Sequence, residues 1–443
     1  METLEILIKA GQLILSLSIL VVLHELGHFI PAKLFKTRVE KFYLFFDPWF
    51  SLFKIKKGET EYGIGWLPLG GYVKISGMID ESMDTEQMKQ PAQPWEFRSK
   101  PAWQRLIIMS GGVIVNFILG FIIYAGIVMA WGVDELDPSE IKHGVAFDQT
   151  LLDMGFENGD NIVAFDDTKI DNYFKATGHF FFEEHKTATV NRNGDLVTIP
   201  LPQDIGTLLI DSNVKSPISL RSPSIIGAVT EGSPADSMGL QVGDLISAID
   251  AEKTPYFNNI VSVLSSKKPG DVVQLTIVRN DLPQKVNLSL SNDITIGFEL
   301  AKVSDNYTWR HIEYGFGESI AVGFSKAGSL LRNYVHSLRF LFSKAGAKQV
   351  GSFLSIGNMF APEWDWQVFW NRTAFLSLIL AVMNLLPIPA LDGGHIVFLF
   401  YEMIAGKPAP EKFMEKAQLV GVILLIGLMI LALGNDIIRF FFS

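Results

Sequence analysis

The sequence predicts a polytopic α-helical membrane protein with four transmembrane helices, a membrane-associated β-loop and a β-rich insertion. Three observations support this class. The mean hydropathy of +0.26, with 48% hydrophobic and 19% charged residues, is too apolar for a soluble chain of 443 residues. Four apolar stretches reach the roughly 20 residues that span a bilayer. Between the second and third stretches a sequence pattern recurs, which indicates two similar domains.

Composition also excludes several classes of function. The formal net charge is −10, and no basic stripe with interleaved aromatic residues is present, so we expect no nucleic-acid partner. The chain has no cysteine, which rules out disulfides, thiolate metal sites and cysteine nucleophiles. Any metal must therefore be bound by His, Asp, Glu or solvent.

The apolar stretches and the basic residues between them predict a topology in the lipid bilayer. We expect transmembrane helices at 1–34, 106–131, 373–404 and 417–443. Lys and Arg cluster at both ends of 35–105 and in the loop 405–416, whereas the two termini carry few. By the positive-inside rule these two segments are cytoplasmic. Both termini and the insertion are then extracytoplasmic.

Within the segment 35–105, residues of about 60–78 have the composition of a β-loop. The sequence EYGIGWLPLGGYVKISGM places aromatic and β-branched residues on both sides of Pro68 and the pair Gly70 and Gly71. Its apolar content is high for a solvated loop, so we expect it to lie at the membrane against the helices, where protein covers its backbone.

The insertion contains an internal repeat. Residues 154–162 recur at 238–246, and 189–201 parallels 276–290, each with a strand, a tight turn and a second strand. This predicts two α+β or β-barrel domains, at 132–215 and 216–303. The pattern, above all GSPADSMGLQVGDLISAID at 232–250, resembles PDZ domains, and this resemblance implies a groove that binds peptide or protein ligands as an added strand.

Two further segments precede the third predicted span. Residues 304–345 show apolar side chains at helical spacing opposite basic ones, which predicts a helix that lies at the membrane interface or packs on the bundle. Residues 346–372 are rich in glycine and tryptophan and are expected to form a linker at the membrane surface.

The first predicted span contains the motif HELGH. His24 and His28 lie four residues apart and so on one helical face, where both imidazoles reach one zinc ion. Glu25 lies beside that face and reaches a water activated by the metal. Two imidazoles and a carboxylate inside an apolar span cost several kcal/mol unless they are paired or coordinated. The motif therefore predicts a Zn²⁺ site.

A catalytic zinc needs a third protein ligand, and the candidate is Asp392 in NLLPIPALDGGHIVF at 384–398. Pro387 and Pro389 interrupt the helix there, as in many intramembrane binding sites. Taken alone, Asp392 is equally compatible with a loop or packing role. His395 is a rival ligand, although a packed histidine is the better interpretation.

The remaining polar residues of interest have open interpretations. Asn116 and Asn384 lie in apolar spans, where an amide joins helices or holds a substrate backbone. The other histidines are scattered along the sequence and are interpreted as structural or exposed: His143, His179, His185, His311 and His336.

Together, HELGH in the first span, the Gly-Gly-Tyr β-loop, the tandem PDZ-like domains and NLLPIPALDGGHIVF resemble the site-2 protease family of intramembrane zinc metalloproteases, peptidase family M50, of bacterial type. The resemblance covers nearly the whole chain. One departure is SGGVIVNF at 110–117, where relatives commonly carry Gly-Pro.

The resemblance implies a bacterial inner-membrane protease with zinc bound by His24, His28 and Asp392 and with Glu25 as the catalytic base, facing the cytoplasm. It implies single-span membrane substrates, such as an anti-sigma factor after a first extracytoplasmic cut, or signal-peptide remnants. It also implies that four residues handle the substrate strand: Asn384, Gly70, Gly71 and Tyr72. The PDZ-like pair would limit access to substrates already trimmed outside.

Two other hypotheses remain. A catalytically silent scaffold would bind extracytoplasmic peptides through its PDZ-like domains and hold a structural metal. A metal transporter would need a second ligand cluster along a path, which the sequence does not show.

Overall fold

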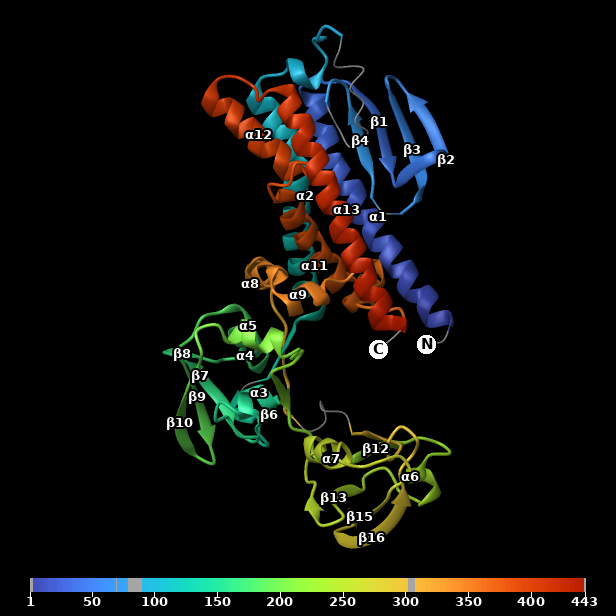
Figure 1. Ribbon diagram of the computed structural model, residues 1–443, viewed down its shortest axis with the longest axis vertical. Coiled ribbons are helices and arrows are strands. Elements are labelled where there is room, and N and C mark those ends of the chain that lie inside the picture. The colour runs from blue at the N-terminus through green and yellow to red at the C-terminus, as the bar shows by residue number, and fades with distance from the viewer. Residues whose placement is uncertain (1–2, 69, 79–89, 137, 302–306, 442–443) are drawn as a thin grey trace. The chain divides into compact units, whose positions relative to one another are not determined.

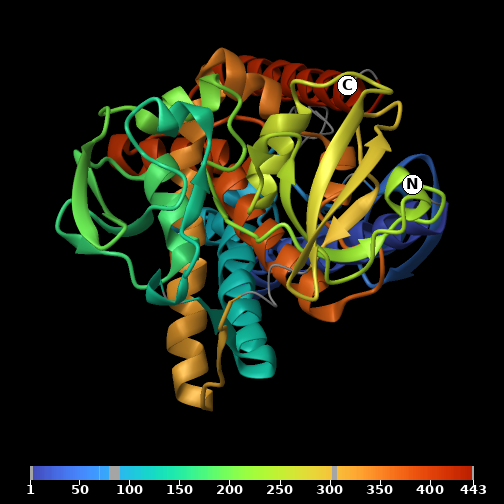
Figure 2. The same ribbon diagram turned by 90° about the horizontal axis from the view of Figure 1, so that it is seen from below.

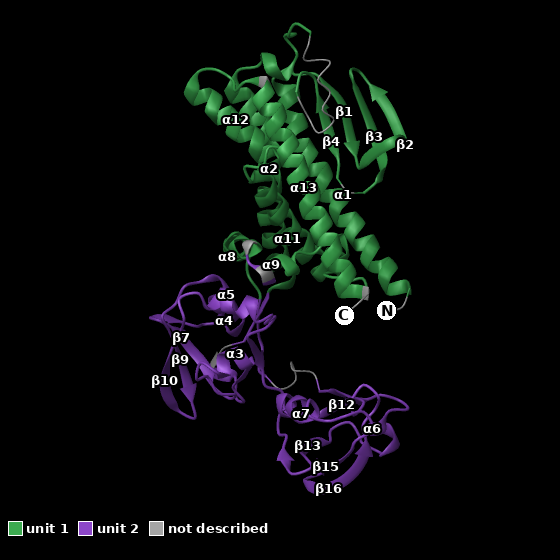
Figure 3. Cartoon of the chain, in the orientation of Figure 1, with its two compact units in different colours: residues 1–132, 313–342, 346–443 green, residues 133–312, 343–345 purple. Residues whose placement is uncertain are grey.

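The computed structural model describes residues 3–68, 70–78, 90–136, 138–301 and 307–441 (Figure 1). Residues 79–89, in the middle of the expected cytoplasmic segment, lie outside this set. The chain divides into two compact units (Figure 3). Unit 1 comprises 1–132, 313–342 and 346–443, and unit 2 comprises 133–312 and 343–345. Each unit is described by itself.

Unit 1 is a helical bundle. Among the described residues, four helices are long and apolar enough to cross a membrane, as the sequence predicts: α1 (Thr3–Leu34), α2 (Ala102–Trp131), α11 (Trp366–Leu385) and α13 (Glu411–Phe441). The stretch 373–404, expected as one interrupted span, is formed by α11 and the separate helix α12 (Asp392–Ala405). Helix α1 begins and α13 ends at the same end of the bundle (Figure 1).

A four-stranded sheet lies beside the C-terminal half of α1 (Figure 1). Its strands are β1 (Val39–Leu44), β2 (Phe46–Lys57), β3 (Thr60–Leu67) and β4 (Tyr72–Ile75), in the order β2-β3-β1-β4. Strand β1 is parallel to β3 and antiparallel to β4. The β-loop expected at about 60–78 thus contains only β3 and β4, the second half of a larger sheet. Strand β4 is an edge strand of that sheet.

The most exposed apolar residues of this sheet lie on β2 rather than in the predicted loop. Trp49, Leu52 and Phe53 are exposed, whereas Trp66 and Val73 are half-buried. Strand β2 was not predicted, because Pro48 and the unbroken run of bulky residues give it no clear period-two alternation.

Helix α8 (Phe316–Ser337) forms within the segment 304–345, where an amphipathic helix is expected. Large apolar side chains such as Phe316 and Val335 are exposed in unit 1. The buried residues are Ser319, Gly323 and Ala327. A Cβ on Gly323 would lie 2.4 Å from Ala125 Cα, so this small-residue stripe lets α8 lie directly against α2 (Figure 2).

Two short helices precede α11. Their bounds are α9 (Lys344–Gln349) and α10 (Phe353–Gly357). Helix α10 is tied to α13 because the buried carboxylate of Asp436 accepts hydrogen bonds from the backbone N–H groups of Ser352 and Ser355, at 2.9 and 3.0 Å.

Unit 2 contains the repeat as two domains with the same strand order. In the first, β7 (Asn161–Phe165), β8 (Thr168–Lys169), β9 (Thr187–Arg192) and β10 (Asp195–Pro200) pair as β10-β9-β7-β8. In the second, the strands are β13 (Leu245–Ile249), β14 (Glu252–Lys253), β15 (Val272–Arg279) and β16 (Leu282–Ser289). Written in the same direction, they pair as β16-β15-β13-β14. The repeat in sequence is therefore a repeat in topology.

The remaining elements of unit 2 are short. The helices are α3 (Gln149–Leu152), α4 (Tyr173–Phe182), α5 (Ile205–Asp211), α6 (Pro234–Ser237) and α7 (Phe257–Leu264). The strands form three pairs: β5 (Val133–Glu135) with β18 (Arg310–Ile312), β6 (Val145–Phe147) with β11 (Ile218–Leu220), and β12 (Ile226–Val229) with β17 (Phe298–Leu300).

The same ion pair fixes the hairpin of each repeat domain. Arg192 at the end of β9 donates to both carboxylate oxygens of Asp160, at 2.8 Å, and Arg279 at the end of β15 does the same to Asp244, at 2.7 and 2.6 Å. Both aspartates are buried. The Gly-Asp pair shared by the two repeats therefore has a structural role.

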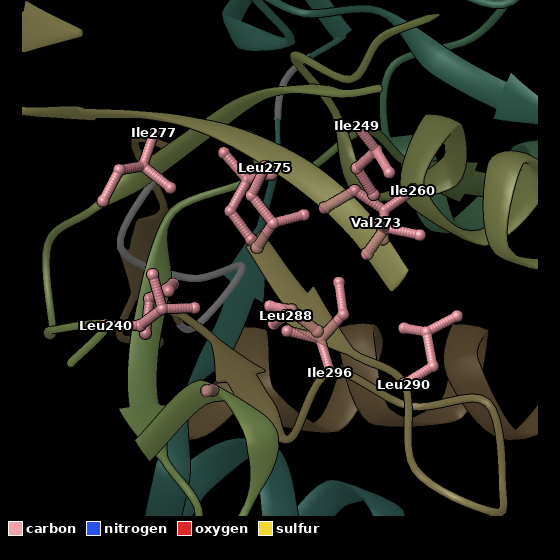
Figure 4. Packing of buried hydrophobic residues seen from close by; sticks show 12 residues of the cluster. Leu240, Ile249, Ile260, Val273, Leu275, Ile277, Leu288, Leu290 and Ile296 are labelled. Carbon is pink, nitrogen blue, oxygen red and sulfur yellow. The ribbon is translucent and has the colours of Figure 1, made fainter. Parts of the chain in front are cut away.

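The second domain has its own hydrophobic core (Figure 4). Alternate residues of β15 point to it, namely Val273, Leu275 and Ile277, and Ile260 of α7 covers them. A strand with one buried and one exposed face follows from this alternation.

Candidate metal centre

Helix α1 and the start of α12 bring three ligand atoms together. His24 Nε2 and His28 Nε2 lie 3.2 Å apart, as expected for residues one helical turn apart. Asp392 Oδ2 lies 3.3 Å from the first of these nitrogens and 3.4 Å from the second. The imidazoles and the carboxylate therefore form a nearly equilateral triangle inside the bundle.

This triangle fits a tetrahedral zinc ion. Ligands held at about 2.0–2.1 Å from such an ion lie roughly 3.3–3.4 Å from one another. Asp392 Oδ2 is buried and has no hydrogen-bond partner within the part of the chain that the structure describes. A buried carboxylate oxygen in this condition is costly unless a cation neutralises it. The residues present thus suit the metal that the motif predicts.

Hydrogen bonds at the far side of each ring set the tautomer that a metal requires. His28 Nδ1 lies 2.8 Å from the carbonyl oxygen of Ile108 on α2, so Nδ1 carries the proton and Nε2 presents its lone pair. His24 Nδ1 lies 3.2 Å from Nδ2 of Asn116, and Oδ1 of the same amide is buried without a partner among the described residues. Turning the amide over exchanges these two atoms and gives Oδ1 a partner. With that oxygen toward the ring, Asn116 accepts the Nδ1 proton of His24.

Glycines on α2 make room for the site. A Cβ on Gly112 would lie 2.4 Å from His28 Nε2 and 2.8 Å from His24 Nε2, which means that a side chain there would occupy the position of the metal. A Cβ on Gly111 would lie 1.9 Å from the carbonyl oxygen of Gly27. The sequence SGG in the second span thus permits the close crossing of α1 and α2.

Asp392 is positioned by the break between α11 and α12. It is the first residue of α12, where the helix dipole favours a negative charge. A Cβ on Gly393 would lie 2.2 Å from the carbonyl oxygen of Leu386, and one on Gly394 would lie 2.4 Å from Pro389 Cα. The two glycines therefore allow the connecting segment to fold back on α12 and hold the carboxylate at the histidines.

The ligands open on a cavity of about 690 Å³ in unit 1. Glu25, which is buried, lines this cavity, as do the other predicted site residues: Gly70, Gly71, Tyr72 and Asn384. A Cβ on Gly71 would lie 2.6 Å from Val21 on α1, so only glycine brings the segment before β4 this close to the helix. Asn384 Nδ2 is 3.4 Å from His24 Nε2.

All eight residues singled out from the sequence for this site therefore meet in one place. His395 also lines the cavity, but the ligand atoms that lie close together at this cavity belong to His24, His28 and Asp392. The part that Gly112 plays was not predicted, and Asn116 had two open interpretations. The segment SGGVIVNF at 110–117, which departs from the usual Gly-Pro, was the available signal for the glycine.

Comparison with known proteins assigns the family. The model of peptidase family M50 matches residues 12–428. A Haemophilus influenzae protein named "Regulator of sigma E protease" is 26% identical over 460 residues, which cover 97% of this chain and 98% of that protein. Proteins named "Putative zinc metalloprotease" from Vibrio cholerae and Borreliella burgdorferi are 27% and 28% identical, each over 96% of this chain and 97% of their own length. The chain therefore belongs to peptidase family M50 and is a membrane zinc metalloendopeptidase of the site-2 protease kind.

Proposed function

We propose that this chain is an intramembrane endopeptidase that cuts single-span membrane proteins at the cavity beside α1. The observation that carries the proposal is that a three-ligand metal triangle, the buried carboxylate of Glu25 and β4, an edge strand of the sheet among the described residues, all border one cavity. Three protein ligands leave one position of a tetrahedral metal for the reaction, as in catalytic rather than structural zinc sites.

His24, His28 and Asp392 hold the metal in this proposal. Zinc, when bound, polarises a carbonyl and lowers the pKa of water toward about 7. Glu25 takes the proton from the attacking water at its carboxylate and returns it to the nitrogen of the leaving amine. Burial of Glu25 within the bundle keeps bulk water from competing for that proton.

Strand β4 is the element we assign to substrate binding. It is an edge of the four-stranded sheet, and residues 70–75 line the cavity. A helical substrate hides its carbonyl groups in its own hydrogen bonds, so it must unwind before it is cut. Pairing with β4 as an added strand would hold the unwound segment at the ligands. We also assign Asn384, whose Nδ2 lies 3.4 Å from His24 Nε2, to holding the substrate backbone.

Topology is inferred from charge, since Lys and Arg flank 35–105 and occupy 405–416. In this arrangement the metal lies toward the cytoplasm of a bacterial inner membrane, and both termini and the repeat domains are extracytoplasmic. The exposed apolar residues of β2, such as Trp49 and Phe53, then face lipid. The repeat domains act as PDZ-like modules that bind peptide or obstruct untrimmed substrates. Two kinds of trimmed substrate would pass these domains: an anti-sigma factor after a first cut and a signal-peptide remnant.

Glu25→Gln tests the proposal. The variant keeps the shape of the site and the three ligands, so zinc content measured by mass spectrometry should equal that of the wild type. Cleavage of a single-span reporter whose outer domain is already removed should fall by about 10²–10⁴-fold, because the base is lost. Glu5→Gln, on the same helix but outside the cavity lining, is the matched control and should cleave normally.

The same experiment separates the protease from a silent scaffold. A scaffold with a structural metal needs no base, so reporter cleavage in the wild type would be absent or would persist unchanged in Glu25→Gln. Either result would refute the assignment of Glu25. Proteomic comparison of membranes containing each variant identifies the natural substrates as single-span fragments that accumulate only with Glu25→Gln.

A further inference from the structure

The first repeat domain brings together three potential ligands that lie outside the metal centre of unit 1. His179 is in the last turn of α4, and Glu183 and His185 follow on the segment that leads to β9. His179 Nδ1 lies 3.0 Å from both Glu183 Oε2 and His185 Nε2, and the last two atoms are 3.3 Å apart. These two histidines are scattered in the sequence and were interpreted as structural or exposed, but the fold brings them into a triangle with Glu183.

The three atoms of this triangle have few protons to share among them. His185 Nδ1 lies 3.1 Å from Asp166 Oδ2, and a proton shared there leaves a lone pair on Nε2 of the neutral ring. His179 Nδ1 carries at most one proton and has two acceptors beside it. Whenever His185 is neutral with its proton on Nδ1, at least one pair of acceptor atoms is in contact without a proton between them. A cation at the centre would turn all three atoms into ligands.

Asp166 holds His185 in a fixed orientation. Its Oδ1 accepts hydrogen bonds from the backbone N–H groups of Lys186 and Thr187, at 3.0 and 2.9 Å, which leaves Oδ2 for the imidazole. The ring of His179 stacks on Phe165, with centroids 5.0 Å apart. A carboxylate behind a ligating histidine is the usual second partner at protein metal sites, where it fixes the tautomer and the ring plane.

The second repeat domain provides an internal comparison. Asp250 occupies the position of Asp166, with a similar backbone angle (φ 53° against 46°) and the same acceptance of a strand N–H, from Gln274. Its Oδ2, however, pairs with the ammonium of Lys267 at 2.6 Å. The second domain thus neutralises Asp250 with Lys267. In the first domain the partner of Asp166 is the imidazole of His185, which also faces His179 and Glu183.

We propose that His179, Glu183 and His185 bind a second divalent transition-metal ion, with Asp166 as the residue that positions His185. Two imidazoles and one carboxylate are a donor set that suits zinc. The imidazoles are 13% and 10% exposed and Glu183 is 42% exposed, so an ion reaches the site from solvent. Bound there, it links the end of α4 to the start of β9 and stabilises the first repeat domain.

The test is the zinc content of the full chain in detergent. Protein stripped with a chelator is equilibrated with buffered Zn²⁺ and analysed by mass spectrometry. The expected result is two zinc ions per wild-type chain and one in His179→Ala with His185→Ala. One is also expected in His24→Ala with His28→Ala, and none when all four histidines are replaced. A wild-type chain that binds only the zinc that depends on His179 and His185 would count against the proposed protease alone, and one that binds only the zinc that depends on His24 and His28 would count against the second site alone.

Glu183→Gln provides a gentler variant, because the side chain is partly exposed and its replacement has the same shape. In the His24→Ala, His28→Ala background, Co²⁺ bound at the second site should give the visible absorption of a tetrahedral ion, and Glu183→Gln should reduce that absorption. His311→Ala is the control, since His311 pairs with Asp134 at 2.7 Å in the same unit and should leave the metal content unchanged. A folded His24→Ala, His28→Ala chain that retains no zinc and shows no cobalt absorption would overturn the proposal.

Discussion

His28 is oriented by a helix to which it does not belong, because its Nδ1 lies 2.8 Å from the carbonyl oxygen of Ile108 on α2. The Nδ1 of His24 lies 3.2 Å from the side-chain amide of Asn116, which is also on α2. Both rings of the HELGH motif thus take their tautomer from α2. A motif on one helix therefore becomes a metal site only when a second helix crosses it closely at Gly27 and Gly111.

Asn116→Ala should weaken zinc binding. Without the amide, His24 loses the acceptor for its Nδ1 proton, and outer partners of this kind typically contribute about 10–100-fold in metal affinity. The measurement is competition against a chelator of known affinity with the purified chain. Ser377→Ala is the control, because Ser377 donates to the backbone carbonyl of Asn116 at 2.7 Å and does not contact the ring. Equal zinc affinity in Asn116→Ala and Ser377→Ala would contradict the orienting role.

Gly112→Ala should abolish both metal binding and cleavage. The added methyl would lie 2.4–2.8 Å from the ligating ring atoms, and they can move away only by separating α1 from α2. Gly126→Ala on the same helix is the control, since no atom lies within 4 Å of its added Cβ. Zinc content and reporter cleavage are measured for both variants. A Gly112→Ala chain that retains zinc at the wild-type level would show that this close approach does not matter.

Asn384→Ala should lower cleavage while leaving zinc in place. Asn384 lies 3.4 Å from His24 Nε2, on the substrate side of the ligand triangle, and is not itself one of the three ligands. Loss of one hydrogen-bond donor at a reacting carbonyl typically costs about 10²–10³-fold in kcat. Asn371→Ala is the control, because the side-chain amide of Asn371 donates to the carbonyl oxygen of Gln367 in its own helix and does not line the cavity. A rise in KM at constant kcat would contradict this role, because it would mean that Asn384 binds the substrate equally well in the ground state and the transition state.

The sequence predicted the helices and the ligands better than the surroundings of the site. Apolar length and the polar cluster at 24–28 are local properties, so α1, α2, α11 and α13 could be recognised without the fold. Strand β2 could not, because Pro48 and its bulky neighbours obscure the alternation of a strand. The role of Asn116 depends on the crossing of α1 and α2. The triangle at His179 depends on a turn whose closure no spacing rule specifies.

Asp244→Asn should destabilise the second repeat domain in a pH-dependent way. The Arg279 guanidinium, bound through two hydrogen bonds, holds the pKa of Asp244 below its ordinary value. The ionised form is thus favoured in the folded domain. Its stabilisation is complete above the unfolded pKa of about 3.9 and is lost as the pH falls through the lower folded pKa. At pH 7 the substitution should cost about 1.5–3 kcal/mol, as expected for a hydrogen bond to a charged group.

Hydrogen exchange of the amides in β13 and β15 measures this effect within the full chain. At pH 7, exchange should be faster in Asp244→Asn than in the wild type, and the difference should shrink as the pH is lowered below about 4, after correction for intrinsic rates. Asp171→Asn removes an exposed pair with Lys175 and should change little, because solvent screens that pair. A difference at β13 and β15 that grows on acidification would mean that Asp244 stabilises the domain in its protonated form, contrary to its bidentate contact with Arg279.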